Sequence, residues 1–584
     1  MRYERLARAY EEIESTSGAL DKIAIFAEVL KEAEAAEIDR VIALTMGKLF
    51  PDWKGEPEIG IAEKMAVQVV ASAASVPEKR VHELLRSLGD IGAAAEELLS
   101  ESVQATLWAD ELTVNRVFDT LYQTAKASGQ GSSREKVSLL VGLLSEAQPL
   151  EAKYILRTVT GSLRLGLGHM GMIDALAIAF TGGRETRGDI ERAFNVCSDL
   201  GYVARLLAEK GIDAVRSISV EVGRPIRMMA AKKLSDPVEI MQKVGGRALV
   251  EYKYDGERLQ VHKDDDEIVL FSRRQERITD QYPDVVEYVR KHVRSKRCVI
   301  EGECVAIDPG TGEMRPFQEL MRRKRKTDIE EMSKEVPVRL FFFDVLYVED
   351  RDVTGRPMLE RRSILEKIID VSRDVRLTTG EVTDSAERLE EIFMAALDTG
   401  HEGVIAKAVH EHSTYQAGSR SWLWIKLKAS YTEGMSDSVD LVIVGALHGR
   451  GKRTGVYGAI LAAAYDDETD TFPTVCKIGT GFTDEMLQEF KERLEPLVAE
   501  TRDPRIISDI EADVWFEPRL VIEVLGDEIT VSPIHPAGRD KIGEGGLAIR
   551  FPRFTGRWRD DKDPTQATTV SEMIELFEQQ RGER

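Results

Sequence analysis

Through the first 220 residues, apolar side chains return at the spacing of an α-helix. Segments 61–70 (IAEKMAVQVV) and 136–144 (KVSLLVGLL) are clear examples, with apolar residues every three or four positions. This period places the apolar side chains on one face of a helix. Only four prolines precede residue 225, so few positions interrupt the pattern. The pattern predicts an all-α domain over residues 1–220.

The pattern changes after Gly245 and Gly246, where short segments rich in β-branched and aromatic residues begin. Such segments are typical of strands. The expected strands are 248–254, 298–306, 339–347 and 423–428, and helices are expected at 360–371 and 386–397. Ser235-Asp236-Pro237 has the capping side chain and the first-turn proline of a helix start. The alternation predicts an α+β domain over residues 221–432.

From residue 433 onward, expected strands are separated by glycine-rich turns. These strands are 439–447, 458–465, 474–479 and 520–524, with one helix at 484–498 and a last helix at 570–580. Short strands with turn signals between them are typical of a small barrel. We therefore expect an all-β barrel domain with a C-terminal helix over residues 433–584. Three domains agree with a length of 584 residues, which is too long for one hydrophobic core.

Composition and charge argue against a membrane protein, a secreted protein and a zinc protein. The chain has no run of 18 apolar residues, so no membrane span is expected, and its charged opening Met1–Arg5 does not resemble a signal peptide. Its four cysteines form no Cys-x-x-Cys pair, which disfavours a zinc site and favours a reducing cytoplasm. The net charge of −22 argues against nucleic-acid binding, although 80 lysines and arginines can still form a local basic surface.

The first residues that carry chemistry are 251–258, which read EYKYDGER. On a strand, Glu251 and Lys253 would point to the same face. A lysine amine is a nucleophile only after it loses its proton, which requires a lowered pKa. An ordinary strand, turn and strand with charged edges is the alternative.

Five later segments follow residues 251–258 in order. They are 272–274 (SRR), 301–303 (EGE), 341–344 (FFFD), 402–407 (EGVIAK) and 424–428 (WIKLK). Together these segments resemble the signature of the covalent nucleotidyltransferases, the superfamily of DNA ligases, RNA ligases and capping enzymes. The resemblance implies that residues 221–432 are an adenylation domain. It also implies that Lys253 is the catalytic nucleophile, which takes AMP from ATP and releases pyrophosphate.

The same resemblance implies roles for individual residues. A metal ion and the cations Arg258, Arg273, Lys426 and Lys428 would lower the pKa of Lys253. Glu303 and Glu402 would bind Mg²⁺, since hard cations prefer oxygen ligands. Phe343 would stack on adenine, whereas Phe341 and Phe342 are explained as core residues. The nucleotide-binding residues that it implies are Glu251, Arg258, Arg273, Glu303, Phe343, Arg420 in the loop 416–420, Lys426 and Lys428.

Two C-terminal segments extend the resemblance. Segment 550–562 (RFPRFTGRWRDDK) resembles the last ligase motif, which closes over the nucleotide and orients pyrophosphate. The matching residues are Arg557, Arg559, Asp561 and Lys562, and a basic surface loop is the alternative. Residues 440–445 with 449–453 (GRGKR) resemble the opening of the ligase oligonucleotide-binding barrel. The C-terminal domain is therefore expected to be an OB-fold whose basic residues contact phosphates.

The helical region distinguishes DNA ligases from capping enzymes and RNA ligases, which generally lack it. Segment 163–168 (LRLGLG) with 174–176 (DAL) resembles the DNA-binding domain of archaeal and eukaryotic ATP-dependent DNA ligases. Segments 316–320 (PFQEL) and 515–518 (WFEP) also match that group. The resemblance covers essentially the whole chain, and its compact size looks archaeal.

This family resemblance implies a function. We expect a cytoplasmic monomer that uses ATP and Mg²⁺ to seal 5′-phosphate/3′-hydroxyl nicks in duplex DNA, in replication, repair and recombination. A lysyl-AMP on Lys253 is the expected intermediate. An RNA-joining or GTP-using capping enzyme and a non-catalytic nick-binding scaffold are the alternatives. The residues do not decide whether ADP, GTP or NAD can replace ATP.

Residues 104–108 (QATLW) suggest a second partner. They resemble the short motif that binds a sliding clamp, with Gln104, Leu107 and Trp108 at its positions. Archaeal ligases carry such a motif near this place. The second aromatic position is missing here, and an ordinary loop or helix start is the alternative.

Overall fold

The computed structural model of the chain forms two compact units. Residues 1–396 and 401–427 make up the first unit, and residues 397–400 and 428–584 the second. The structure describes residues 1–102, 111–163, 165–324, 329–428, 438–449, 455–479, 482–526, 528–543, 545–550 and 552–582. No helix in these ranges has both the length and the apolar character needed to cross a membrane.

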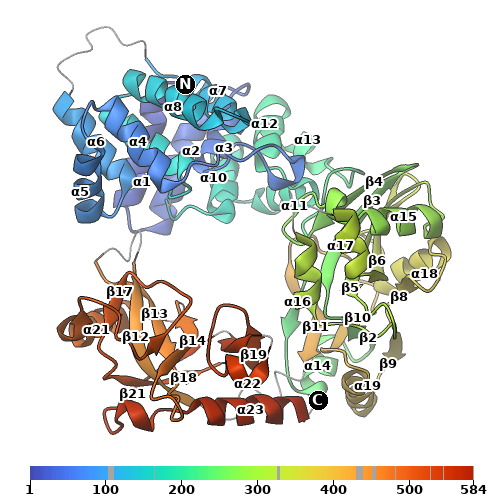
Figure 1. Ribbon diagram of the computed structural model, residues 1–584. Coiled ribbons are helices and arrows are strands. Elements are labelled where there is room, and N and C mark those ends of the chain that lie inside the picture. Colours follow the sequence, from blue (N-terminus) through green and yellow to red (C-terminus); the bar gives the residue numbers. More distant parts are fainter. Residues whose placement is uncertain are drawn as a thin grey trace. The chain divides into compact units, whose positions relative to one another are not determined.

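The first unit begins with an all-helical region (blue to cyan in Figure 1). Its helices are α1 (Tyr3–Ser15), α2 (Ala19–Glu32), α3 (Ile38–Thr45), α4 (Glu63–Ala73), α5 (Glu78–Leu88), α6 (Ile91–Ser102), α7 (Val114–Lys126), α8 (Ser132–Glu146), α9 (Pro149–Val159), α10 (His169–Thr181), α11 (Arg187–Cys197), α12 (Leu200–Lys210) and α13 (Ile212–Arg216). A short 3₁₀ turn, η1 (Asp52–Lys54), follows α3.

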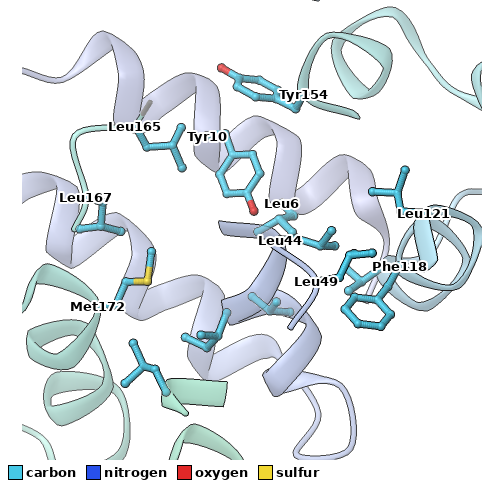
Figure 2. Packing of buried hydrophobic residues seen from close by; sticks show 14 of the residues in the cluster. Leu6, Tyr10, Leu44, Leu49, Phe118, Leu121, Tyr154, Leu165, Leu167 and Met172 are labelled. Atoms are coloured by element: carbon cyan, nitrogen blue, oxygen red, sulfur yellow. The ribbon is translucent and has the colours of Figure 1, made fainter. Parts of the chain in front are cut away.

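The helices pack because each buries one apolar face. In α1, Leu6, Tyr10 and Ile13 are fully buried at intervals of three and four residues, as the helical period requires. Figure 2 shows Leu6 and Tyr10 among side chains of neighbouring helices. The Tyr10 ring meets Tyr154 edge-on at 5.3 Å, and its hydroxyl lies 2.9 Å from Thr45 Oγ1. A buried hydroxyl is therefore satisfied without opening the core.

The rest of the first unit is a mixed α/β region with two sheets. One sheet has the strand order β1-β11-β10-β2-β9, and the other has the order β4-β3-β5-β6-β7, with β8 beside β6. The strands are β1 (Ala230–Lys233), β2 (Ala248–Lys253), β3 (Glu257–Asp264), β4 (Glu267–Ser272), β5 (Arg297–Ala306), β6 (Val338–Val348), β7 (Arg351–Asp352), β8 (Val375–Leu377), β9 (Gly380–Thr383), β10 (Gly403–Ala408) and β11 (Arg420–Lys428).

Helices accompany these sheets. They are α14 (Pro237–Lys243), α15 (Pro283–His292), α16 (Phe317–Leu320), α17 (Ile329–Glu335), α18 (Met358–Ile368) and α19 (Ala386–Asp398), with 3₁₀ turns η3 (Thr279–Gln281) and η4 (Met321–Lys324). The helix α14 begins after Asp236, whose side chain accepts a hydrogen bond from the Val238 amide, with Pro237 in its first turn. The helix start expected from these residues is thus present.

The turn between β2 and β3 joins the two sheets and requires glycine. A Cβ atom on Gly256 would collide with the carbonyl oxygen of Cys304 on β5 and would lie 3.0 Å from Cγ of Glu303. Any larger residue would push the turn away from β5. The Asp-Gly pair therefore keeps the end of β2 close to the strand that carries Glu303.

A β-bulge lies in β6 next to Phe343. Glu301 pairs with Asp344 and Gly302 with Phe342, so Phe343 is an extra residue on β6. Such a bulge re-aims a side chain and is frequent beside active sites. A Cβ on Gly302 would lie 2.8 Å from the Phe342 ring, so glycine is needed opposite the bulge.

The second unit is rich in strands. Its larger sheet has the order β15-β17-β12-β13-β14-β16, with β18 pairing β12 and β21, and β19 pairs with β20. The strands are β12 (Val439–His448), β13 (Tyr457–Ala463), β14 (Phe472–Ile478), β15 (Val498–Ala499), β16 (Ile506–Ile507), β17 (Val514–Phe516), β18 (Val521–Leu525), β19 (Glu528–Ser532), β20 (Gly546–Arg550) and β21 (Arg553–Trp558). The helices are α21 (Asp484–Leu494), α22 (Arg539–Ile542) and α23 (Val570–Gly582), with 3₁₀ turns η6 (Glu495–Leu497) and η7 (Pro564–Gln566).

The predicted fold class is confirmed: an all-helical region, a mixed α/β domain and a strand-rich C-terminal domain. Two local predictions are wrong. The helix expected over 484–498 ends at Leu494, because Pro496 cannot donate the next helical hydrogen bond. Arg420, expected in a loop, begins β11. The domain boundaries at 220/221 and 432/433 stay predictions.

Candidate active site

Lys253 is the last residue of β2, where that strand lies beside Gly403 on β10. Its amine forms an ion pair with Oε2 of Glu402, the residue before β10. The amine also lies 3.4 Å from the carbonyl oxygen of Tyr254. Pairing of β2 with β10 thus brings together two candidates from distant parts of the sequence.

Carboxylates dominate the charge around Lys253. Burial by itself would lower the pKa of Lys253, but Glu402, Glu303 and Asp255 together outweigh burial and raise that pKa. The prediction that cations lower the pKa of this lysine is therefore wrong for the residues of the chain itself. The sequence motifs named candidate cations, but they could not show which charges lie near Lys253 in the folded chain.

Burial is the largest influence on the pKa of Glu303. Burial and the neighbouring carboxylates of Glu402 and Asp255 raise its pKa to about 7, although Lys253 and Arg258 act in the opposite direction. Carboxylates crowded in this way suit a divalent cation, which is a hard Lewis acid with oxygen ligands. Among the described residues, however, no group of three or more His, Cys, Asp or Glu side chains could hold a metal by itself.

Glu251 lies in a buried cluster of donors. Its Oε2 forms an ion pair with Lys407 Nζ at 2.5 Å. Its Oε1 accepts from Arg362 Nη1 at 2.7 Å and from the Thr378 hydroxyl at 2.5 Å. The Glu251 carboxylate is 2% exposed, so these three donors replace water as its partners. Sequence reasoning assigned no role to the three donors, although Lys407 stands in the motif 402–407.

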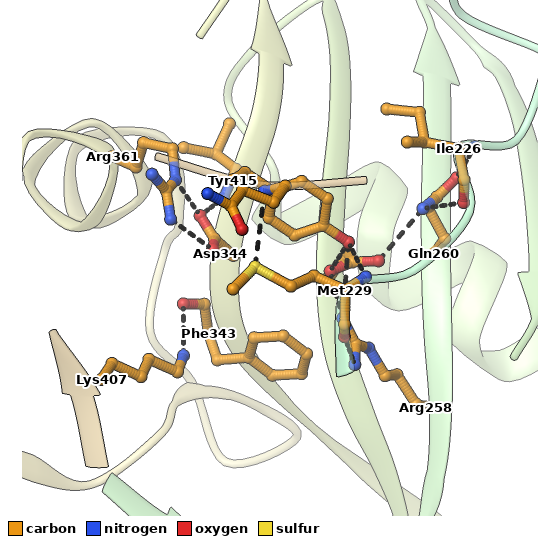
Figure 3. A network of polar contacts seen from close by, with 12 residues as sticks. Ile226, Met229, Arg258, Gln260, Phe343, Asp344, Arg361, Lys407 and Tyr415 are labelled. Atoms are coloured by element: carbon orange, nitrogen blue, oxygen red, sulfur yellow. Dashed lines mark hydrogen bonds and ion pairs between the residues drawn. The ribbon is translucent and has the colours of Figure 1, made fainter. Parts of the chain in front are cut away.

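Two cationic side chains, Arg258 and Lys407, lie near the ring of Phe343. Cζ of Arg258 lies 5.1 Å and Nζ of Lys407 lies 4.7 Å from the centre of its ring, within cation–π range. Trp424 meets the same ring edge-on at 6.2 Å. Figure 3 shows Phe343 between Lys407 and Arg258.

The two preceding phenylalanines have other surroundings. Phe341 stacks on Tyr254 at 4.0 Å, with 25° between the rings. Phe342 is fully buried in the hydrophobic core of the β3–β6 sheet. Both are core residues, as expected, and only Phe343 stands at the bulge beside the charged cluster.

Arg258 is held at two of its three guanidinium nitrogens. Nη1 donates to the carbonyl oxygen of Met229 at 2.7 Å, and Nη2 donates to Oε2 of Glu301 at 2.7 Å. Its Nε is buried and has no hydrogen-bond partner among the described residues. Buried donors are nearly always paired in folded proteins, so this nitrogen is suited to an acceptor on a ligand.

The remaining candidates of the mixed domain come from the turn after β4 and from β11. Arg273 is exposed in the turn after β4 and, with Arg258, lines a cavity of about 920 Å³. Arg420 is exposed at the start of β11, and Lys426 and Lys428 are half-buried farther along that strand. The structure thus groups Lys253 with Glu303 and Glu402, and Arg258 with Phe343, and Arg273 lines the same cavity as Arg258.

The C-terminal candidates form their own cluster within the second unit. Arg559 Nη1 and Lys562 Nζ both pair with Oδ2 of Asp440, at 2.5 and 2.7 Å. Arg559 also pairs with Asp561 at 2.8 Å, and Arg557 lies 3.5 Å from Glu523. Asp440 is therefore a partner that sequence reasoning missed. The expected clamp residues Gln104, Leu107 and Trp108 lie outside the described residues.

Family models match three successive parts of the chain. The "DNA ligase N terminus" model matches residues 2–177, the "ATP dependent DNA ligase domain" model matches residues 228–428, and the "ATP dependent DNA ligase C terminal region" model matches residues 453–562. The central match spans both sheets and the whole Lys253 cluster. Fold and site therefore define a multidomain, ATP-dependent nucleic-acid-joining enzyme.

Known DNA ligases are similar to this chain along nearly its full length. The chain is 51% identical to "DNA ligase 2" of Thermofilum pendens and 48% identical to a DNA ligase of Hyperthermus butylicus, in both cases over 99% of this chain and 98% of the relative. A solved structure titled "Pmar-Lig_PreS3" has a TM-score of 0.56 at 16% identity, covering 95% of this chain and 99% of that one, and supports the fold alone. The chain belongs to the ATP-dependent DNA ligase family, and its general activity is the sealing of nicks in DNA.

Proposed function

We propose that Lys253 is the nucleophile of this ligase. The observation that carries the proposal is its position: a lysine at the end of β2 that pairs with Glu402 and interacts with Glu303, a carboxyl that also interacts with Arg258. In the first step, Lys253 Nζ forms a bond to the α-phosphorus of ATP, and the bond to the bridging oxygen breaks as pyrophosphate leaves. A lysine amine performs such chemistry once it is deprotonated.

Two further transfers complete the reaction. An oxygen of the 5′-phosphate at the nick attacks the phosphorus of the lysyl-AMP, and the bond to Lys253 breaks. The 3′-hydroxyl then attacks the activated 5′-phosphate, the phosphodiester forms and AMP leaves. The chain's contribution is to position these groups and to stabilise developing charge, as in phosphoryl transfer generally.

The nucleotide is held by the residues around Lys253. Phe343 offers its ring to the adenine, Glu251 approaches the nucleotide from the same strand as Lys253, and Arg258 directs its unpaired Nε toward an acceptor. Arg273, Arg420, Lys426 and Lys428 bind phosphate once the nucleotide is present. Arg557, Arg559, Asp561 and Lys562 orient pyrophosphate during the first step.

Glu303 and Glu402 would hold Mg²⁺. The fit rests on a buried carboxyl, that of Glu303, which lies close enough to Glu402 and Asp255 to interact with both; burial raises its pKa. When bound, the ion neutralises these carboxylates and the phosphates of the nucleotide. Burial of Lys253 then acts in the direction that favours its neutral amine.

The first experiment measures transfer of label from ATP labelled at the α-phosphate. Wild-type protein is expected to retain label on the chain, and Lys253→Ala to retain none. Lys291→Ala, which removes an exposed lysine of α15, is the matched control and should label normally. Label that persists in Lys253→Ala would refute the assignment.

Nick sealing with ATP, GTP and NAD in parallel tests the cosubstrate. We propose that ATP supports sealing of a 5′-phosphorylated DNA nick with Mg²⁺ present. Sealing of an RNA nick instead of a DNA nick would contradict the proposed substrate.

The clamp partner, the cellular compartment and the oligomeric state complete the proposal. Residues 104–108 bind a sliding clamp, and the double variant Leu107→Ala, Trp108→Ala should lose that binding; unchanged binding would reject the motif. The protein is cytoplasmic, consistent with its four unpaired, buried cysteines. It acts as a monomer. Light scattering after gel filtration tests the monomer.

A further inference from the structure

The segment of residues 223–229, here called the strap, connects α13 to β1 and is bound by one face of β3. Three alternating residues of β3 hold its backbone: Arg258, Gln260 and His262. Alternate residues of a strand share a face, so the three side chains form a row. The row begins at Arg258, the residue with the unpaired Nε.

Each contact of the row is directional. His262 Nδ1 accepts a hydrogen bond from the Gly223 amide at 3.0 Å, so its proton is on Nε2, which donates to Gln260 Oε1 at 2.9 Å. Burial lowers the pKa of His262 to about 3, which agrees with a neutral ring. Gln260 then binds both backbone groups of Ile226: Oε1 accepts from the amide at 2.8 Å, and Nε2 donates to the carbonyl at 3.1 Å.

Glu301 and Tyr415 connect this row to the guanidinium. Gln260 Nε2 donates to Glu301 Oε1 at 3.0 Å, and Glu301 Oε2 accepts from both Arg258 Nη2 at 2.7 Å and the Tyr415 hydroxyl at 3.0 Å. The Tyr415 oxygen in turn accepts from the Met229 amide at 2.9 Å. Arg258, Glu301, Tyr415 and Met229 are thus linked in a closed ring of hydrogen bonds, of which Figure 3 labels Arg258, Tyr415 and Met229.

Tyr415 is the member of the ring that fixes both supports of Arg258. Its hydroxyl donates to Glu301, which binds Nη2, and accepts from Met229, whose carbonyl binds Nη1. Tyr415 is 5% exposed and Glu301 is fully buried, so water cannot replace the lost partner easily. With both terminal nitrogens held, the direction of the Arg258 Nε–H bond is determined.

We propose that Tyr415 is a positioning residue for Arg258 in the reaction with ATP. The proposal rests on the proposed function, in which Arg258 contacts the nucleotide. Tyr415 does not touch the nucleotide; it keeps the guanidinium in the one orientation that directs Nε to its acceptor. Small displacements of such a group cost large factors in rate or binding.

The test is a double-mutant cycle on adduct formation, with Tyr415→Phe and Arg258→Lys. Tyr415→Phe keeps the ring and deletes the hydroxyl, and a hydrogen bond to a charged group corresponds to about a tenfold effect or more. We expect the KM for ATP to rise about tenfold in Tyr415→Phe. Arg258→Lys keeps the positive charge beside Glu301 but lacks the planar set of guanidinium donors. The KM for ATP of the double variant should therefore be no higher than that of Arg258→Lys alone.

Tyr282→Phe is the matched control. It deletes another buried tyrosine hydroxyl, which donates to Glu257 at 2.6 Å. Glu257 lies on β3 directly before Arg258. Glu257 and Arg258 point to opposite faces of β3. We expect Tyr282→Phe to lower the melting temperature without changing the KM for ATP.

The outcomes separate the proposal from the proposed function. An unchanged KM in Tyr415→Phe, or a Tyr415→Phe effect that persists undiminished in the Arg258→Lys background, overturns the positioning role while leaving Arg258 as a nucleotide contact. An Arg258→Lys variant with wild-type KM overturns both. If Tyr415→Phe does not fold, Glu301→Gln removes the charge that both Arg258 Nη2 and the Tyr415 hydroxyl bind, and the same cycle with Arg258→Lys applies.

Discussion

The buried ion pair between Asp344 and Arg361 provides the sharpest test of how the active-site bulge is supported. Both side chains are fully buried, and the guanidinium binds the carboxylate through Nε at 2.8 Å and Nη2 at 3.0 Å. Arg361 Nη1 also donates to the carbonyl oxygens of Arg356 and Ser413. Asp344 directly follows Phe343, so this pair fixes the strand next to the bulge.

The perturbation is Asp344→Asn, which removes the negative charge and keeps the size of the side chain. The cost of leaving a buried charge without its counter-ion is about 3–5 kcal/mol. For a domain of about 200 residues, each kcal/mol shifts the melting temperature by roughly 2–4 °C. We therefore expect the transition of the mixed α/β domain to fall by about 6–20 °C.

Calorimetry on the full chain measures this shift, and ATP-dependent labelling at each temperature shows that the domain carrying Lys253 is the one affected. The matched control is Glu381→Gln, because Arg388 binds Glu381 with the same two-pronged geometry, at 3.0 and 2.7 Å, on an exposed surface. Exposed pairs contribute little, so this control should melt like the wild type.

A second variant tests whether the unpaired charge is the cause of the loss. Replacing both partners, Asp344→Leu with Arg361→Met, removes the charges together, and such replacements are often neutral in stability. The double variant should therefore be more stable than Asp344→Asn. A double variant that melts no higher than the single one, or an Asp344→Asn variant that melts like wild type, would refute the role of the unpaired charge.

Two further predictions follow from the same domain. Gly256→Ala should lower both thermal stability and adduct formation, because the new methyl group collides with the Cys304 carbonyl, whereas Gly355→Ala, with open space around it, should change neither; equal behaviour of the two variants would contradict this. His262, with its pKa lowered to about 3 by burial, stays neutral in the native protein while the unfolded chain takes up a proton below pH 6.5. Stability is therefore complete above pH 6.5 and is lost as the pH falls toward 3, by about 2 kcal/mol at pH 5. His262→Gln should show a shallower loss in acid denaturation monitored by circular dichroism, and parallel pH curves would reject this origin.

Local periodicity along the chain determined much of the fold. The predicted strand 248–254 corresponds to β2 at Ala248–Lys253, and the predicted strand 339–347 to β6 at Val338–Val348. Helical spacing likewise identified the all-helical region. Periodicity is a property of neighbouring residues, so it can be read without knowledge of long-range contacts. It missed the end of α21, where one proline outweighed a continuing apolar pattern.

The sequence by itself determined which chemical groups are present and in what order: a lysine at a strand end, glutamates, a phenylalanine and basic residues in the motifs of a ligase family. The tertiary structure decided which of them meet. Arg362 and Thr378 bind Glu251 from 111 and 127 positions away, and the bulge at Phe343 exists only through pairing with β5. Charge interactions depend on distance and burial, so only the folded chain could show that Glu402, Glu303 and Asp255 together outweigh burial and raise the pKa of Lys253.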